Sequence, residues 1–512
     1  MPEPLASQGV SLPAGFPRRR RGRWLPLIAA GLLLAACLVS LHGLTTAGLR
    51  AYRERARPEL VVGQDRMTRR NAAFVRLGLL HFRPAFCEPA DLAADTPEAR
   101  RLFGQALPAP PASRLPGQRP PSTELLPPAR ENVPTDFADV SLVCRAADLF
   151  DPDRGIVARP FDRGDAAERV AWVSARVGGQ IALETPVGLR VHGGSSRVGP
   201  MKSFSLNFRE RHGGYDHSPP GLFFGPDAPA VRRLLLITAY EGSQFNNILA
   251  TEIAGRLGCR VSRAVPARLT VNGTEIPAPY FLVEHQSPDY VANHDGFDHV
   301  EWHRLKSEEE PPDSFTLWRK WQRRTKDIDL AEEASRFDLD YLCAWVLAIT
   351  FTSTTDNDQG AYYRDASVPD APWRCLTWDL DAAFNTGLYI YKERTVDCSR
   401  QAFEILVGER GILFYRLIAG SPEFREQFRA FARQKLEKDL PPDALLALVD
   451  RHIARARALP HLTDEALPAL ERSRAFLATR HQAYFALLDE LLDRAARGEA
   501  EYFFSPQPSR PQ

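Results

Sequence analysis

The chain has 512 residues, of which 44% are hydrophobic, so it can bury a substantial core in one or more domains. Its 65 Lys and Arg residues nearly cancel its 64 Asp and Glu residues, which leaves a formal net charge of +1. A charge this small excludes the strong overall positive field typical of nucleic-acid-binding proteins. No CxxC pair or Cys/His cluster has the spacing of a tetrahedral zinc site, so we expect no structural zinc.

The N-terminal region predicts a membrane anchor. Residues 24–49 contain no Asp, Glu, Lys or Arg and are rich in Leu and Ala, which suits a helix across a hydrocarbon core of roughly 30 Å. The arginines of the basic tail, residues 1–23, favour a cytoplasmic N-terminus and therefore an extracytoplasmic C-terminal domain. Arginines within residues 50–57 act against this orientation. The sequence predicts a single-pass membrane protein.

A cleaved lipoprotein signal is the alternative. Leu34-Ala35-Ala36-Cys37 resembles a bacterial lipoprotein cleavage site, which would leave Cys37 lipidated at a new N-terminus. The apolar run continues beyond this cysteine to Leu44, and that favours an uncleaved anchor. Six further cysteines suit either disulfides in an oxidising compartment or reduced core thiols, and the sequence leaves the two open. They are Cys87, Cys144, Cys259, Cys343, Cys375 and Cys398.

The predicted elements begin with a linker. Residues 50–135 comprise a juxtamembrane segment, with a short helix or strand expected within 50–105, and a proline-dense spacer over 107–134. The compact domain is predicted over 136–497. Strands are expected over 136–144 and 171–183 from their β-branched alternation and Gly-Gly turn. Asn272-Gly273 predicts a hairpin with a type I′ turn.

The second half of this domain is helical. Apolar residues at helical spacing predict one helix over 330–350 with Asp338 or Asp340 near its start, and this helix leads directly into a polar loop at Asp356. More helices are expected over 411–417, 422–440, 442–457 and 467–497, before a flexible tail at 498–512. A strand-rich lobe followed by a helical lobe is an α+β fold.

Three polar segments carry the predicted chemistry. The first, Gly188–Arg209 (GLRVHGGSSRVGPMKSFSLNFR), places a loop rich in Gly and Ser and then Lys202 between two strands, which can set backbone N–H groups and an ammonium against phosphates. The second holds Asp356, and the third, WDLD, holds Asp379 and Asp381. This is the order in which kinases present a catalytic and then a metal-binding aspartate. An Asx-turn for Asp356 and a helix cap for Asp381 are the structural alternatives.

Several separated motifs together resemble the CotH kinase family, whose members are atypical, kinase-like enzymes. Besides the Gly/Ser segment, they include LFDPDRGI (149–156), the helix block at 234–258, FLVEH (281–285) and TWDLDAAF (377–384), all in the family's order. The resemblance implies an atypical protein kinase-like two-lobed fold. It also implies a catalytic Asp356, metal ligands at Asp379 and Asp381, and nucleotide contacts from Lys202, Arg197, Ser196, Asn247 and Glu284. A cap at Asn247 and an edge charge at Glu284 are the alternatives.

The implied function is a membrane-anchored kinase. The resemblance predicts binding of ATP with Mg²⁺ or Mn²⁺ and phosphoryl transfer to Ser or Thr of a surface or envelope protein. The family pattern usually has Asn at position 361, where this chain has Ala, so Asn357, Asp358 or Gln359 would have to substitute or one metal would be lost. Transfer of AMP or activation of a carboxylate is a second possibility, and a degenerate surface structural or adhesive protein is a third.

Overall fold

A computed structural model describes the chain over residues 95–103, 137–177, 180–212, 214–238, 244–304, 311–324, 328–357, 359–384, 406, 408–458 and 463–499. The chain divides into two compact units, residues 1–61 and 62–512, and every described residue belongs to the second. The predicted anchor at 24–49, the proline-dense spacer and the tail beyond residue 499 lie outside the described residues.

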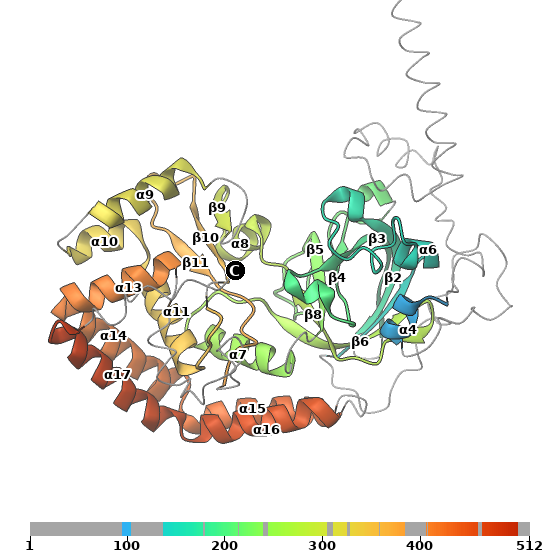
Figure 1. Cartoon of the computed structure of the whole chain (residues 1–512). Coiled ribbons are helices and arrows are strands. Elements are labelled where there is room, and N and C mark those ends of the chain that lie inside the picture. Colours follow the sequence, from blue (N-terminus) through green and yellow to red (C-terminus); the bar gives the residue numbers. More distant parts are fainter. Residues whose placement is uncertain are drawn as a thin grey trace, which may run out of the picture. The chain divides into compact units, whose positions relative to one another are not determined.

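The first half of the second unit forms a closed sheet (Figure 1). Among the described residues eight strands pair in the order β1-β2-β3-β4-β5-β8-β6-β7, and β1 also pairs with β6 in parallel, which closes a ring with β7 outside it. The other pairs are antiparallel. The strands are β1 (Ala138–Val143), β2 (Arg169–Val177), β3 (Gln180–His192), β4 (Ser203–Asn207), β5 (Arg233–Thr238), β6 (Ala264–Val271), β7 (Thr274–Glu275) and β8 (Tyr280–Glu284).

Side chains alternate between the inside of this ring and its outer face. Leu189 and Val191 of β3 pack with Phe204 and Leu206 of β4 in one apolar core, whereas the residues between them on both strands are polar. The predicted strands and the Asn272-Gly273 hairpin are confirmed, since φ is +52° at Asn272 and +82° at Gly273, as a type I′ turn requires. Closure leaves few exposed strand edges.

The lobe's core also includes residues that precede the proline-dense spacer. Helix α4 (Pro97–Phe103) buries Ala99, Leu102 and Phe103 in the same core as the ring, and the Phe103 ring meets that of Phe150 edge-on at 6.4 Å. Phe150 ends helix α6 (Ala146–Phe150), which follows β1 directly. The folded unit therefore extends upstream of residue 136.

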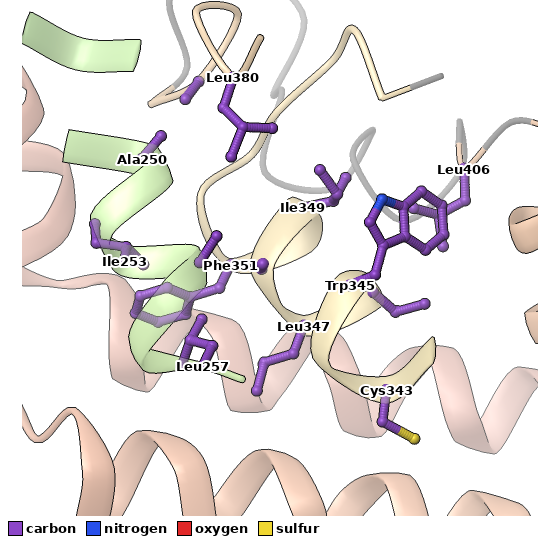
Figure 2. Packing of buried hydrophobic residues seen from close by; sticks show 14 of the residues in the cluster. Ala250, Ile253, Leu257, Cys343, Trp345, Leu347, Ile349, Phe351, Leu380 and Leu406 are labelled. Atoms are coloured by element: carbon purple, nitrogen blue, oxygen red, sulfur yellow. The ribbon is translucent and has the colours of Figure 1, made fainter. Parts of the chain in front are cut away.

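The rest of the unit is a helical lobe with a small sheet. Strands β9 (Val300–Arg304), β10 (Ala361–Asp365) and β11 (Arg374–Leu376) form the sheet in the order β11-β10-β9. Helix α7 (Gln244–Arg256) packs on α11 (Leu339–Phe351), as Figure 2 shows for Ile253, Leu257 and Phe351. Around them lie α8 (Pro288–Asp295), α9 (Asp313–Arg324), α13 (Gly408–Gly420), α14 (Pro422–Gln434), a π-helical turn (Lys435–Asp439), α15 (Pro442–Arg457), α16 (Thr463–Ala478) and α17 (Arg480–Ala496).

The single helix predicted over 330–350 is wrong. The chain forms α10 (Leu330–Arg336) and α11, and Phe337 between them bridges to Trp373. Asp338 begins the second helix, because its side chain accepts a hydrogen bond from the backbone N–H of Tyr341 at 3.2 Å. The predicted segment 422–440 is helical through Asp439, as α14 followed by the π-helical turn, and α15 has the predicted bounds. The predicted segment 467–497 breaks once, at Thr479 between α16 and α17.

Two findings bear on the predicted compartment. Within the described ranges, no helix is both long enough and apolar enough to cross a membrane. Cys144, Cys259, Cys343 and Cys375, the four cysteines of the described residues, form no disulfide, and burial raises the pKa of each thiol above its usual range.

The α4 contact predicts a stability effect. Phe103→Ala should lower the free energy of unfolding by about 3 kcal/mol, because it removes a buried ring and leaves a cavity. Phe161→Ala is the matched control, since that ring is 56% exposed and its loss should cost less than about 0.5 kcal/mol. Urea unfolding of the full chain measures both values. Equal effects of the two substitutions would show that α4 does not belong to the core.

Buried histidines predict a pH dependence. Burial lowers the pKa of His212 and of His452 below 6.5, although each hydrogen-bonds a glutamate. As the pH falls below 6.5, these histidines bind protons in the unfolded chain but not in the native chain. The free energy of unfolding that is present above pH 6.5 is therefore lost as the pH falls. Urea unfolding at pH 7.5 and pH 5.5 should show this loss, and His452→Gln should reduce it. If His452→Gln and wild type lost the same unfolding free energy between pH 7.5 and pH 5.5, the lowered pKa of His452 would be contradicted.

Candidate functional site

The loop that carries Asp356 is hydrogen-bonded to the segment that carries the other two aspartates. It follows the C-terminus of α11, and the backbone N–H of Thr355 donates to the carbonyl of Ala382 at 3.1 Å. In the reverse direction the N–H of Phe384 donates to the carbonyl of Thr352 at 2.7 Å. These two bonds bring the predicted catalytic and metal-binding segments together.

The three predicted aspartates act on one another electrostatically. Burial first, and then the negative charges of Asp379 and Asp356, raise the pKa of Asp381 to about 8. Its Oδ1 atom is buried and has no hydrogen-bond partner. The side chain of Asp379 is exposed and that of Asp356 is half-buried. Mutual repulsion of this kind marks a place where a cation would be stabilised.

Asn247 fixes the backbone between the two WDLD aspartates. Its Oδ1 atom accepts a hydrogen bond from the N–H of Leu380 at 3.0 Å, and the Leu380 side chain packs into the helical core (Figure 2). Asp379 itself has φ of +64°, a left-handed conformation that is uncommon outside glycine. The resemblance implied a nucleotide contact for Asn247, and the structure shows a residue that holds the aspartate segment.

A buried arginine links the loop that carries Asp356 to the end of β11, just before the WDLD segment. Arg410 of α13 is 1% exposed and donates to the carbonyl oxygens of Asn357, Gln359 and Leu376 at 3.2–3.3 Å. Its guanidinium also lies 4.3 Å from the centre of the Trp345 ring. The sequence does not predict a role for Arg410, and its only signal is a charged residue within an otherwise apolar helix face.

The carboxylates fit a magnesium or manganese site of the kind completed by a substrate. Among the described residues, no three side chains of His, Cys, Asp or Glu are close enough together to bind a metal ion by themselves. In enzymes that act on nucleotide phosphates, Mg²⁺ is usually held by one or two carboxylates together with substrate phosphates and water. The orphaned Asp381 Oδ1 and the exposed Asp379 carboxylate match that incomplete site.

The two cationic side chains predicted to bind phosphate form hydrogen bonds to backbone carbonyls of this chain. Lys202 is 7% exposed, and its Nζ donates to the carbonyls of Arg197 and Gly199 at 2.7 and 2.6 Å. Arg197 donates to the carbonyls of Gly193 and Pro160, both at 2.6 Å. Strand β4 begins at Ser203, so Lys202 precedes the strand in which it was expected. Both cations shape the Gly/Ser loop.

Ser196 and Glu284 are also placed by local contacts. Ser196 lies against Gly193, where φ is +114° and a Cβ atom would meet Ser196 Oγ at 2.2 Å, so the position requires glycine. Glu284 is 1% exposed and accepts hydrogen bonds from the backbone and side chain of Arg263 at 2.7–3.1 Å. Burial opposes ionisation, but His294 and Arg263 outweigh it and lower the pKa of Glu284. Its charge is therefore balanced within the lobe.

A family comparison agrees with this arrangement. The model of the CotH kinase protein family matches residues 189–335 and 331–474, more than half of the chain. The chain belongs to the CotH kinase protein family. The match includes the Gly/Ser loop, Asn247 and all three aspartates. The chain is accordingly classed with the atypical protein kinases, and its strand-rich lobe followed by a helical lobe is the kinase-like fold.

Other comparisons add little. No curated protein matches the chain. One of the solved structures that it matches is the Helicobacter pylori proinflammatory kinase CtkA, with 10% sequence identity, a TM-score of 0.28, and coverage of 52% of this chain and 92% of that chain. The two structures superpose too poorly for any residue of one to be assigned from the other.

The departure from the CotH pattern lies at the start of β10. Ala361 begins β10, is fully buried, and has no side-chain oxygen that could bind a metal. Of the three neighbours named as substitutes, Asp358 lies outside the described residues. Gln359 Nε2 is 3.5 Å from Asp356 Oδ2, and Asn357 is buried with its carbonyl bound by Arg410.

The Asn247 contact predicts a loss of metal affinity. Asn247→Ala leaves the Leu380 N–H unpaired, which should cost about 1–3 kcal/mol of stability and loosen the aspartate segment. Asn246→Ala is the control, because Asn246 is also buried but accepts from Ser473 Oγ at 3.1 Å, away from the aspartates. Mn²⁺ titration by calorimetry in the presence of ATP should show weaker binding only in the first variant. Equal affinity in both variants would contradict the role of Asn247.

Proposed function

We propose that this chain is an atypical protein kinase that transfers the γ-phosphoryl group of ATP to a Ser or Thr hydroxyl. The observation that carries this proposal is the group of three aspartates, held together by the bonds between the loop of Asp356 and the WDLD segment. Membership of the CotH family supports it. Phosphoryl transfer requires positioning and charge neutralisation, and a protein nucleophile is not needed.

Each aspartate has a distinct role in this proposal. Asp356, half-buried in its loop, orients the acceptor hydroxyl and accepts its proton. Asp379 and Asp381 hold Mg²⁺ or Mn²⁺, which when bound neutralises charge on the nucleotide phosphates. Burial and the other two aspartates raise the pKa of Asp381 to about 8, and a bound cation would favour its ionised form. Asn247 and Arg410 hold the backbone of the WDLD segment and of the residues just before it in place.

The Gly/Ser loop completes the proposed nucleotide site. Lys202 and Arg197 hold the loop backbone in one conformation, which lets its N–H groups approach the phosphates. Ser196, beside Gly193, lies in this loop. The chain is further proposed to be anchored by residues 24–49 and to act on a surface or envelope protein, which the apolar N-terminal sequence supports.

A degenerate protein is the second candidate. Ala361 favours it, because the position where the family pattern usually has Asn carries no metal-binding group. Such a protein would retain the fold as a surface structural or adhesive module.

Substitution of the metal ligand tests the proposal. With ATP and Mn²⁺ at about 100 times Kd, binding should add about 2.7 kcal/mol to the unfolding free energy. Asp379→Ala should abolish this gain, whereas Asp340→Ala, an equally exposed aspartate at the start of α11, should keep it. Thermal melting of the full chain measures the shift, and the product identifies the reaction, ADP for phosphoryl transfer and pyrophosphate for AMP transfer. Retained turnover in a folded Asp379→Ala protein would contradict the proposed kinase function.

A further inference from the structure

A second cluster of charge, built from arginine and histidine, lies on the outer face of the sheet. It comprises Arg233 at the start of β5, His192 at the end of β3, and His285 directly after β8. Arg233 Nη1 is 3.3 Å from His285 Nε2, and the two imidazole rings lie edge-on with centroids 6.5 Å apart. Arg304, at the exposed end of β9, is near enough to act on both histidines.

The nearby carboxylates are already engaged by other arginines. Asp165 and Glu168 form ion pairs with Arg190, Arg209 and Arg211, three cations for two anions. Both carboxylates also act on Arg233 electrostatically, so four arginines share two anions.

The nearest carboxylate in sequence is equally committed. Glu284 precedes His285 on β8, so its side chain projects to the opposite face of the strand. There it is bound by Arg263. The cluster around Arg233 therefore has a surplus of positive charge.

The two histidines are buried beside these arginines, and both effects lower their pKa values. Burial, followed by the charges of Arg233, Arg197 and Arg304, lowers the pKa of His192 to about 3. Burial and Arg233 likewise hold the pKa of His285 well below its ordinary value. Both imidazoles are therefore neutral at pH 7, and each retains an N–H that can donate to an anion.

Two contacts bring this cluster to the edge of the aspartate site. Gln286, next to His285, donates from Nε2 to the carbonyl of Thr377 at 3.2 Å. The guanidinium of Arg304 lies 5.7 Å from the centre of the Trp378 ring. Thr377 and Trp378 immediately precede Asp379, so positive and negative groups flank the same short segment.

Resting on the proposed function, we propose that Arg233 and Arg304, with the imidazoles of His192 and His285, form the subsite that binds the polyphosphate chain of the nucleotide. A guanidinium can bind phosphate oxygens in a bidentate manner and remains charged at all physiological pH values. The subsite takes over the charge neutralisation that Lys202 and Arg197 cannot supply while they hold the Gly/Ser loop.

Inorganic tripolyphosphate without metal is the direct probe. Calorimetry on the full chain should detect binding that weakens with added salt, and Arg304→Gln should raise Kd at least tenfold. This exposed residue can be changed without disturbing the core. Arg233→Gln should act in the same direction, with thermal melting as a check of folding. Arg472→Gln, an exposed arginine on α16, is the matched control and should leave Kd unchanged.

The outcomes separate this subsite from the proposed kinase function. If wild type binds both tripolyphosphate and ATP in an Arg304-dependent manner but releases no ADP, the subsite stands and the kinase proposal falls. If ATP with Mn²⁺ binds equally to wild type and to both folded variants, the subsite is overturned and the kinase proposal stands. Absence of tripolyphosphate binding by wild type also overturns the subsite.

Discussion

The site depends on one constraint, the pairing of the loop after α11 with the segment after β11. Two backbone hydrogen bonds join Thr355 to Ala382 and Phe384 to Thr352. They hold carboxylates together that repel one another, as the raised pKa of Asp381 shows. These cross-bonds act against the repulsion between the like charges that the two loops carry.

The helical core supplies the rigidity for that pairing. The Leu380 side chain packs with α7 and α11 (Figure 2), while Asn247 and Arg410 bind the backbone on either side. Arg410 is a buried cation that donates hydrogen bonds to three carbonyl oxygens, and its burial would be unfavourable without them. Buried polar side chains that hold one pair of loops in place are typical of functional sites.

Closure of the strand ring has a different consequence. The parallel pairing of β1 with β6 closes the ring, and side chains then alternate between its inside and its outer face. The outer row is polar on β4, whereas on β5 and β8 it includes Leu235, Phe281 and Val283, which pack in the helical core. His192, Arg233 and His285 come from three strands that are far apart in sequence, and they meet because all three belong to the outer row or its continuation.

Much of the fold followed from local patterns. The strands 136–144 and 171–183, the Asn272-Gly273 turn and α15 were predictable, because alternation, turn chemistry and helical spacing act over a few residues. The break before α11 was not, since Phe337 leaves the helix to pair with Trp373, a partner distant in sequence. Helix α4 was missed as part of the core for the same reason.

The sequence by itself determined the family, the α+β order of its two lobes and the three aspartates, because motifs are read directly from residue types and their order. Only the tertiary structure decided what the other polar residues do. Lys202, Arg197 and Glu284 bind neighbours within their own lobe, and Asn247 binds the aspartate segment. A side chain's partner is set by distances across the folded chain, which residue order does not encode locally.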